Sequence, residues 1–204
     1  LYNMNYDNQL IKTGEINDVG YFTSTNIKSS YRRGLEIEAG YQLNSKFNLS
    51  GNLTISENKV DSFTQFIDNW DTWGQEMVLH ENTDLAFSPN MIWAAQADYK
   101  LNSKTTILFN SKYVGEQFID NTSNTERMLD AYLVSNLQID YVFNSFLFKK
   151  AKFSFLINNL FDVEYVNNAW LYRYITNSFD PTESDIYTTL GSDGVYDMAG
   201  YFPQ

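Results

Sequence analysis

Few side chains in this sequence could carry covalent or metal chemistry. His80 is the one histidine, and there is no cysteine. Acid–base and nucleophilic catalysis often depends on these two residue types. His80 lies in a long connecting segment, where exposure to solvent is the ordinary alternative to a role as base, haem contact or ligand. We therefore expect no catalytic residue, no enzyme activity, no metal site and no cofactor.

Acidic residues form the next group of candidates. Asp180, Glu183 and Asp185 lie close together, but their spacing matches no calcium-binding loop. Acidity is concentrated in residues 57–88, with seven acidic residues against Lys59, and in residues 162–204, with seven against Arg173. The plain interpretation is that both segments are solvated loops. Because phosphate contacts require Lys and Arg, this distribution disfavours nucleic acid as a partner.

The elements that position these residues have the period of a β-strand. From residue 35 to 43, apolar side chains alternate with polar ones, and the pattern resumes after the turn Asn44-Ser45-Lys46. Such alternation predicts strands with one apolar and one wet face. We predict polar loops over 14–30, 57–88 and 117–128, and no strand in 166–204. Seven strands are expected, over residues 1–11, 35–43, 47–56, 91–101, 106–113, 131–143 and 151–165.

The connections between these strands favour a membrane barrel over a soluble sandwich. Long and short connections alternate strictly, as short turns at one end of a barrel and long loops at the other require. The strands have about ten residues, enough to cross a bilayer at a tilt. Aromatic residues gather where the apolar faces end, as interfacial girdles do. No apolar run is long enough for a membrane-spanning helix.

The predicted strands cannot close a barrel alone. An open sheet edge in lipid leaves backbone groups unpaired at a cost of several kcal/mol each. The chain opens directly on a predicted strand at Leu1 and has no signal peptide before it. We therefore expect a fragment of a larger antiparallel transmembrane β-barrel.

One motif resembles a known family. Asn159-Leu160-Phe161-Asp162, followed by Tyr165, resembles the NLFD-x-x-Y signature that lies one strand before the end of TonB-dependent outer-membrane receptors. Further pieces resemble the same receptors and extend the likeness over nearly the whole chain: Asn8-Gln9-Leu10, Ser30-Tyr31, Gly34-Leu35-Glu36, Ser88-Pro89-Asn90 and Lys112-Tyr113-Val114-Gly115.

The resemblance implies an architecture and a place of action. Members of this family have a barrel of about 22 strands around an N-terminal plug, and they import scarce ligands with energy delivered through the TonB protein. Residues 1–204 would then be the C-terminal part of such a barrel, with the plug and the final strand outside the chain. The implied location is the outer membrane of a Gram-negative bacterium. The implied partners are membrane lipid, the plug, the remaining strands, TonB and a small nutrient.

The resemblance also assigns roles to residues. Ligand capture would fall to the extracellular loops, because aromatic faces supply contact area for sugars, catechols or porphyrins and Arg pairs with anionic groups. Loop packing or interfacial anchoring is the alternative for each Trp. The candidate ligand contacts are Trp70, Trp73, His80, Trp170, Tyr172 and Arg173. A second group of polar residues would line the lumen and contact the plug; the alternative is that they only solvate the lumen. These residues are Glu36, Glu38, Asn52, Gln96, Asp98, Asn110, Asn136, Gln138, Asp140 and Asn158.

Several functions remain open at this point. TonB-dependent active uptake of a ferric siderophore or another metal chelate is the leading hypothesis, with a glycan as the second ligand class. A passive porin would have no plug upstream. An outer-membrane hydrolase would need a strand histidine, and this segment supplies none. A secreted adhesive β-domain would pair its apolar faces in a sandwich and would be soluble without detergent.

Overall fold

The chain is built almost entirely of strands. The computed structural model describes residues 1–16, 22–147 and 149–204. Among these residues, no helix is long and apolar enough to cross a membrane. The described elements are β1 (Tyr2–Ile16), β2 (Phe22–Gln42), β3 (Phe47–Asn69), β4 (Gly74–Asp84), β5 (Met91–Lys100), β6 (Thr105–Val114), β7 (Gln117–Phe118), β8 (Met128–Leu129), β9 (Tyr132–Phe143), β10 (Ala151–Ile157), β11 (Val166–Ile175), the 3-10 helix η1 (Pro181–Glu183), β12 (Thr188–Leu190) and β13 (Tyr196–Pro203).

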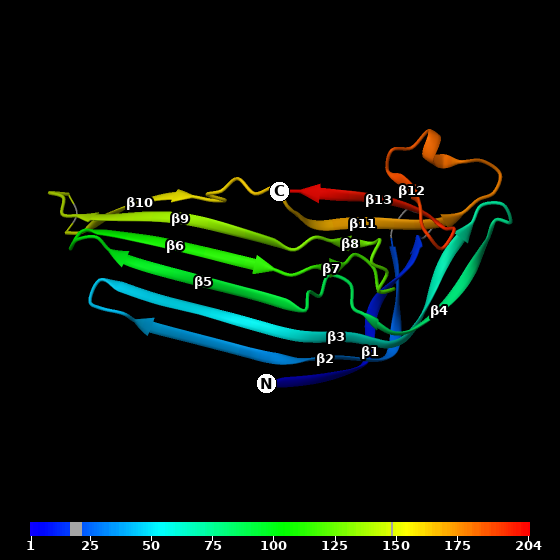
Figure 1. The fold of residues 1–204 in the computed structure, drawn as a ribbon, viewed down its shortest axis with the longest axis horizontal. Helices are drawn as coiled ribbons and strands as arrows, with labels where there is room; N and C mark the ends of the chain where they lie inside the picture. Colours follow the sequence, from blue (N-terminus) through cyan, green and yellow to red (C-terminus); the bar gives the residue numbers. More distant parts are fainter. Residues whose placement is uncertain (17–21, 148) are drawn as a thin grey trace.

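The long strands form one antiparallel meander, which confirms the predicted all-β fold. β1, β2, β3, β5, β6, β9 and β10 pair in this order, each antiparallel to the next. Figure 1 shows β2, β3, β5, β6, β9 and β10 side by side along the long axis of the sheet, with part of β1 bending away from it. Each of the seven predicted strands overlaps one of these seven strands. The sheet therefore has the up-and-down connectivity of a barrel wall.

Short turns lie at one end of the sheet, which we call the turn end. The β2–β3 turn is closed by Asn44, whose side-chain oxygen accepts the backbone N–H of Lys46 at 2.8 Å. In the β5–β6 turn, Asn102 accepts the N–H groups of Lys104 and Thr105, each at 2.9 Å. Asn supports tight turns because its short amide can replace a backbone partner. Both predicted three-residue turns are therefore present.

The strand registers place polar and apolar residues on opposite faces. Directly paired residues share a face, and Leu35 lies opposite Ile55, which in turn lies opposite Met91. This apolar face continues across the sheet and exposes large side chains. Its exposed members are Leu35, Ile37, Tyr41, Leu49, Ile55, Met91, Tyr99, Leu133, Tyr141, Phe143, Phe153 and Phe155.

The opposite end of the sheet, which we call the loop end, differs most from the sequence prediction. The segment 57–88 is not a loop, because β3 runs on to Asn69 and pairs with β4 as a long hairpin. Buried side chains in β3 change from even positions, ending at Val60, to odd positions, starting at Phe63. This change in parity interrupts the simple alternation by which a strand is recognised.

Two other segments in which no strand was predicted also contain longer strands, and the predicted loop 117–128 contains the two-residue strand β7 and the start of β8. The segment 14–30 is largely strand, since β1 extends to Ile16 and β2 starts at Phe22; residues 17–21 lie outside the described part of the chain. The tail 166–204 contains β11, β12 and β13, of which β11 and β13 form an antiparallel hairpin. In β11, apolar residues point to both faces, so no period of two marks it as a strand.

The stretch predicted as a strand over 151–165 ends early. β10 stops at Ile157, and Asn159 has a left-handed backbone with φ 49°. The Asn159 side chain accepts the N–H of Val163 and donates to the Val163 carbonyl, both at 3.0 Å. Asn tolerates this backbone conformation better than most residues. The NLFD segment is thus a turn that separates β10 from β11, not the end of a strand.

Buried apolar side chains gather at the loop end in two clusters. The first joins β1, β2 and β3 through Ile11, Ile27, Val60 and Phe63, and it includes Leu85 from the segment that follows β4. The second contains Ile119, Leu129 and Ala169, with Phe87, Val166 and Leu171 packed against it. These clusters fix the segments that carry the candidate site.

Candidate functional site

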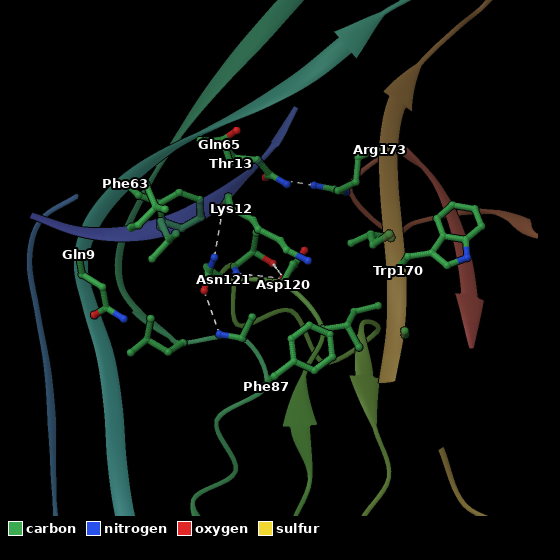
Figure 2. A pocket seen from close by; sticks show the side chains of 18 of the residues that line it. Gln9, Lys12, Thr13, Phe63, Gln65, Phe87, Asp120, Asn121, Trp170 and Arg173 are labelled. Carbon is green, nitrogen blue, oxygen red and sulfur yellow. Dashed lines mark hydrogen bonds between the residues drawn. The ribbon is translucent and has the colours of Figure 1, made fainter. Parts of the chain in front are cut away.

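A cavity of about 240 Å³ lies between the two clusters at the loop end. Its walls come from β1, β2, β3, the segments 85–87 and 119–122, and β11, and Figure 2 shows most of these side chains. Its lining is mixed, with apolar groups such as Phe63 and Phe87 beside polar groups such as Gln9 and Asn121. A concave site with apolar walls and a few fixed polar groups is typical of small-molecule binding.

Asn121 fixes one wall of this cavity. Its side-chain oxygen accepts the backbone N–H of Ala86 at 2.9 Å, and its amide nitrogen donates to the Lys12 carbonyl at 3.3 Å. Asn121 is 5% exposed. A buried amide costs free energy unless it is hydrogen-bonded, so these two bonds tie β1 to two separate connecting segments (Figure 2).

Gln65, which also lines the cavity, joins two of the residues predicted as ligand contacts. The Gln65 oxygen lies 3.0 Å from Nε2 of His80 and accepts Nη1 of Arg173 at 3.3 Å. The His80 ring is half-buried and stacks on Phe63, with ring centroids 5.2 Å apart. The structure thus brings His80 and Arg173 together, although they are far apart in the sequence.

Behind Arg173 lies a buried network of charges that joins three segments of the loop end. Arg173 donates from Nε to Asp197 at 2.6 Å and from Nη2 to Asp193 at 2.5 Å. Arg127 donates to Asp120 at 2.8 Å and to Asp197 at 3.2 Å. Both arginines are 3% exposed. Arg173 therefore has its donors committed within the protein.

This network and its surroundings shift the pKa values of nearby groups. Burial by itself lowers the pKa of Arg173, but its pairs with Asp197 and Asp193 outweigh this effect and raise the pKa overall. The pKa of His80 is lowered, first by burial and then by the positive charges of Arg173 and Arg127, although Asp120 opposes them. A half-buried imidazole with a lowered pKa is neutral at neutral pH.

Further from the cavity, aromatic residues form an outer cluster around Trp70. The Trp70 ring stacks on Tyr174 with centroids 4.0 Å apart, and its Nε1 donates to the Tyr172 hydroxyl at 3.1 Å. The Tyr172 hydroxyl donates in turn to Asp68 at 2.7 Å. Burial, and then the bond to Asp68, raise the pKa of Tyr172 to about 12. Trp70 and Tyr172 thus hold the β3–β4 hairpin against β11.

The two remaining tryptophan candidates lie apart from this cluster. Trp73 is 93% exposed at the tip of the β3–β4 hairpin. Trp170 belongs to the cavity wall, but Figure 2 shows its ring directed away from the cavity. That ring lies over Gly200 on β13, where a Cβ atom would clash with the indole. Close approach of the ring therefore requires glycine at position 200.

The polar residues predicted for a lumen wall share one face of the sheet. The registers align Glu38 with Asn52, Gln96 with Asn110, and Asn110 with Asn136. Neighbours on this face are hydrogen-bonded, as in Asn136 to Asn110 at 2.9 Å. The same face carries Glu36, Asp98, Gln138 and Asp140. Asn158 follows the last paired residue of β10.

Of the three acidic residues that lie close together in the tail, Asp180 and Asp185 have structural roles. Asp180 caps η1 by accepting the N–H of Thr182 at 2.9 Å, and Asp185 accepts the N–H of Tyr187 at 2.9 Å. The described ranges bring no three His, Cys, Asp or Glu side chains together in a way that could hold a metal ion.

Several residues of the loop end were missed by sequence reasoning. Arg127 and Asp197 form the centre of the charge network, and Gln65 links it to His80. Tyr174 is 1% exposed and supports Trp70. One sequence feature could have indicated the charge network: residues 162–204 contain seven acidic residues and a single basic residue, Arg173. A lone cation in an acidic segment is a candidate for internal pairing.

Comparisons with known proteins agree with this fold. A family model described as TonB dependent receptor-like, beta-barrel matches residues 1–160. No curated protein matches the chain by sequence.

Solved structures with a similar fold include those of three bacterial proteins. The ferric-catecholate import receptor Fiu from E. coli K12 has a TM-score of 0.52 and 15% identity, over 98% of this chain and 24% of that one. The ferric yersiniabactin uptake receptor FyuA from Yersinia pestis has a TM-score of 0.51 and 12% identity, over 87% of this chain and 23% of that one. FpvA from P. aeruginosa, solved with heterologous pyoverdines, has a TM-score of 0.50 and 16% identity, over 81% of this chain and 21% of that one.

This chain thus spans about a quarter of the length of the receptors whose fold it shares. The chain has a meander of long strands, with short turns at one end and long connections at the other. This arrangement is that of a barrel wall in such receptors. Because the family model covers most of its residues, the chain belongs to the TonB-dependent receptor-like β-barrel family.

Proposed function

We propose that this chain is the C-terminal part of a Gram-negative outer-membrane receptor for TonB-dependent uptake of a scarce nutrient. The observation that carries the proposal is the family match over residues 1–160. The ligand that we propose is a ferric siderophore or another metal chelate, the class named for Fiu and FyuA. The plug, the segment that contacts TonB and the final strand would lie outside residues 1–204.

The two faces of the sheet support a position in the outer membrane. Exposed side chains such as Ile37, Leu49 and Phe155 would face lipid, because a band of apolar residues is stable only where hydrocarbon covers it. Ser111 and Ser135 also lie on this face, and their hydroxyls hydrogen-bond to each other at 2.7 Å. This pairing satisfies both groups in an environment without water.

The polar face would then line the lumen and meet the plug. Its amides and carboxylates, among them Asn52, Gln96 and Asp140, provide donors and acceptors along the whole wall. The loop end would be extracellular, with the 240 Å³ cavity open to ligand above the plug. Trp70, Trp73 and Trp170 remain candidates for ligand contact in this arrangement. We assign His80 and Arg173 to support of the cavity wall, since both bond to Gln65.

The test is transport by the full-length receptor in a Gram-negative host that lacks its own ferric siderophore receptors. Uptake of labelled iron from a panel of ferric siderophores is measured with the host's TonB present and deleted. We expect saturable uptake of at least one ferric chelate, abolished by loss of TonB. Uptake that persists without TonB would instead identify a passive channel. TonB-dependent uptake of an oligosaccharide and of no ferric chelate would overturn the proposed ligand class.

A further inference from the structure

A second cavity lies at the tip of the β3–β4 hairpin, outside the first one. It has a volume of about 360 Å³ and is bounded by Trp70, Trp73 and Phe179, with Asp71, Thr176 and Ser178 beside them. The Trp70 and Phe179 rings are inclined by 29°, with centroids 6.2 Å apart. Aromatic walls around an open cavity offer ring faces, and ring faces attract cations through their quadrupole.

The carboxylate of Asp71 carries a charge at this cavity but has no acceptor position to spare. One oxygen accepts the hydroxyls of Thr176 at 3.2 Å and Ser178 at 2.6 Å. The other accepts the backbone N–H of Asn177 at 2.7 Å and its side-chain amide at 3.1 Å. A carboxylate has about four lone-pair positions, and all are used here. It therefore acts on a ligand through charge, not through hydrogen bonds to sugar hydroxyls.

The charge of Asp71 is maintained and is not balanced by a cation. The hydrogen bond from Ser178, followed by that from the Asn177 backbone, lowers the pKa of Asp71 to about 2. Within the described ranges, no Lys or Arg forms an ion pair with Asp71, and the guanidinium of Arg173 is bound to Asp193 and Asp197. The segment 57–88 carries seven acids against Lys59. The potential at the hairpin tip is therefore negative and attracts cations.

Trp73 is held at this cavity at a cost to stability. Its backbone is left-handed, with φ 56°, and the side chain is 93% exposed. For a non-glycine residue this conformation is strained, and an exposed indole recovers little of the cost by packing. Asn69 supports the turn by accepting the N–H groups of Asp71 and Thr72 at 3.1 and 3.2 Å. Strain at an exposed aromatic residue points to a role outside folding.

We propose that this cavity binds a cationic organic group of the quaternary ammonium class, against Trp70, Trp73 and Phe179 and beside the charge of Asp71. Such a group needs ring faces and a nearby negative charge, and it donates no hydrogen bond that Asp71 would have to accept. A neutral glycan lacks the charge and requires free acceptors. This binding site is independent of the proposed uptake, because it rests on the hairpin tip alone.

The probe is choline, with its neutral isostere 3,3-dimethylbutan-1-ol as the matched ligand. Binding to the purified full-length receptor in detergent is followed by saturation-transfer NMR and by tryptophan fluorescence at millimolar concentrations. We expect choline to bind about tenfold more tightly than the isostere, with affinity that falls as salt increases. Equal affinity for the two probes, or no binding of choline, would overturn the proposal.

Variants locate the site on the receptor. Trp73→Ala removes an exposed side chain, and we expect it to weaken choline binding about five- to tenfold. Asp71→Asn keeps the shape and removes the charge, so it should reduce the preference for choline over the isostere. Met77→Ala is the control, because Met77 is 70% exposed on the same hairpin and does not line the cavity. Equal effects of Trp73→Ala and Met77→Ala would place choline elsewhere and refute this site.

Discussion

Replacing Asp197 by Asn should loosen the loop end without disturbing the meander of long strands. Asp197 accepts Arg173 at 2.6 Å and Arg127 at 3.2 Å, and its side chain is 7% exposed. Removing one partner of a buried ion pair costs about 3–5 kcal/mol, because a charge is left uncompensated in a dry environment. Each arginine keeps a second carboxylate, Asp193 or Asp120. We therefore expect Asp197→Asn to lower the free energy of opening the loop end by the lower limit of this range, about 3 kcal/mol.

The assay is hydrogen exchange of the full-length receptor in a bilayer mimic, followed by mass spectrometry. Since about 1.4 kcal/mol corresponds to a factor of ten, amides of residues 117–129 and 188–203 should exchange about a hundredfold faster in Asp197→Asn. Amides of β5 and β6 should not change, because they lie beyond the network. Glu183→Gln is the matched control, since it also removes one negative charge, from an exposed position in η1.

The result that would refute this reasoning is equal exchange in Asp197→Asn and Glu183→Gln. The ion pairs would then contribute no more than an exposed charge, and the apolar clusters alone would hold the loop end. Faster exchange throughout the sheet would refute the separation of the loop end from the barrel wall.

Two further predictions concern the hairpin tip and the apolar face. Hydrogen bonds, first that from Ser178, lower the pKa of Asp71 to about 2, whereas a free Asp has a pKa of about 3.9. Because these bonds favour the charged carboxylate, they stabilise the segment 176–178 fully above about pH 4. This stabilisation should be lost as the pH falls towards 2, and the loss should change the tryptophan fluorescence between pH 4 and pH 2. The same change in Asp71→Asn, which has no carboxyl group at this position, would contradict the prediction. Ser135→Ala should destabilise the full-length barrel to urea by about 1 kcal/mol, since it leaves the Ser111 hydroxyl unpaired on the apolar face. Ser111→Ala with Ser135→Ala should recover most of the loss, and a double variant that is less stable than Ser135→Ala would show that the pairing is not the cause.

The barrel wall could be predicted from the sequence because a sheet with one apolar and one polar face follows a local rule. Between Leu35 and Ile55, each second residue faces the apolar side, so the period of two is visible in every short window. The turns at Asn44 and Asn102 also follow from local chemistry, since the Asn side chain closes the turn with neighbouring amides. These features need no knowledge of distant contacts.

The ends of the strands were harder to predict for a physical reason. The period of two that begins at Phe153 can be followed to Phe161, yet β10 ends at Ile157 because Asn159 turns the backbone. Beyond Val60 the buried side of β3 changes parity. At the loop end, the strands bury side chains against other segments on changing sides, so no single period is required and strands resemble loops.

The sequence by itself determined the fold class, the family resemblance and the acidic character of the long connections. Only the tertiary structure decided which groups meet at the loop end. Arg127 and Asp197 are 70 residues apart, and Trp70 and Tyr172 are 102 apart. Such pairs depend on how two hairpins fold over the sheet, which no local pattern encodes. For that reason Arg173, a candidate ligand contact in the sequence, became part of a buried ion-pair network in the structure.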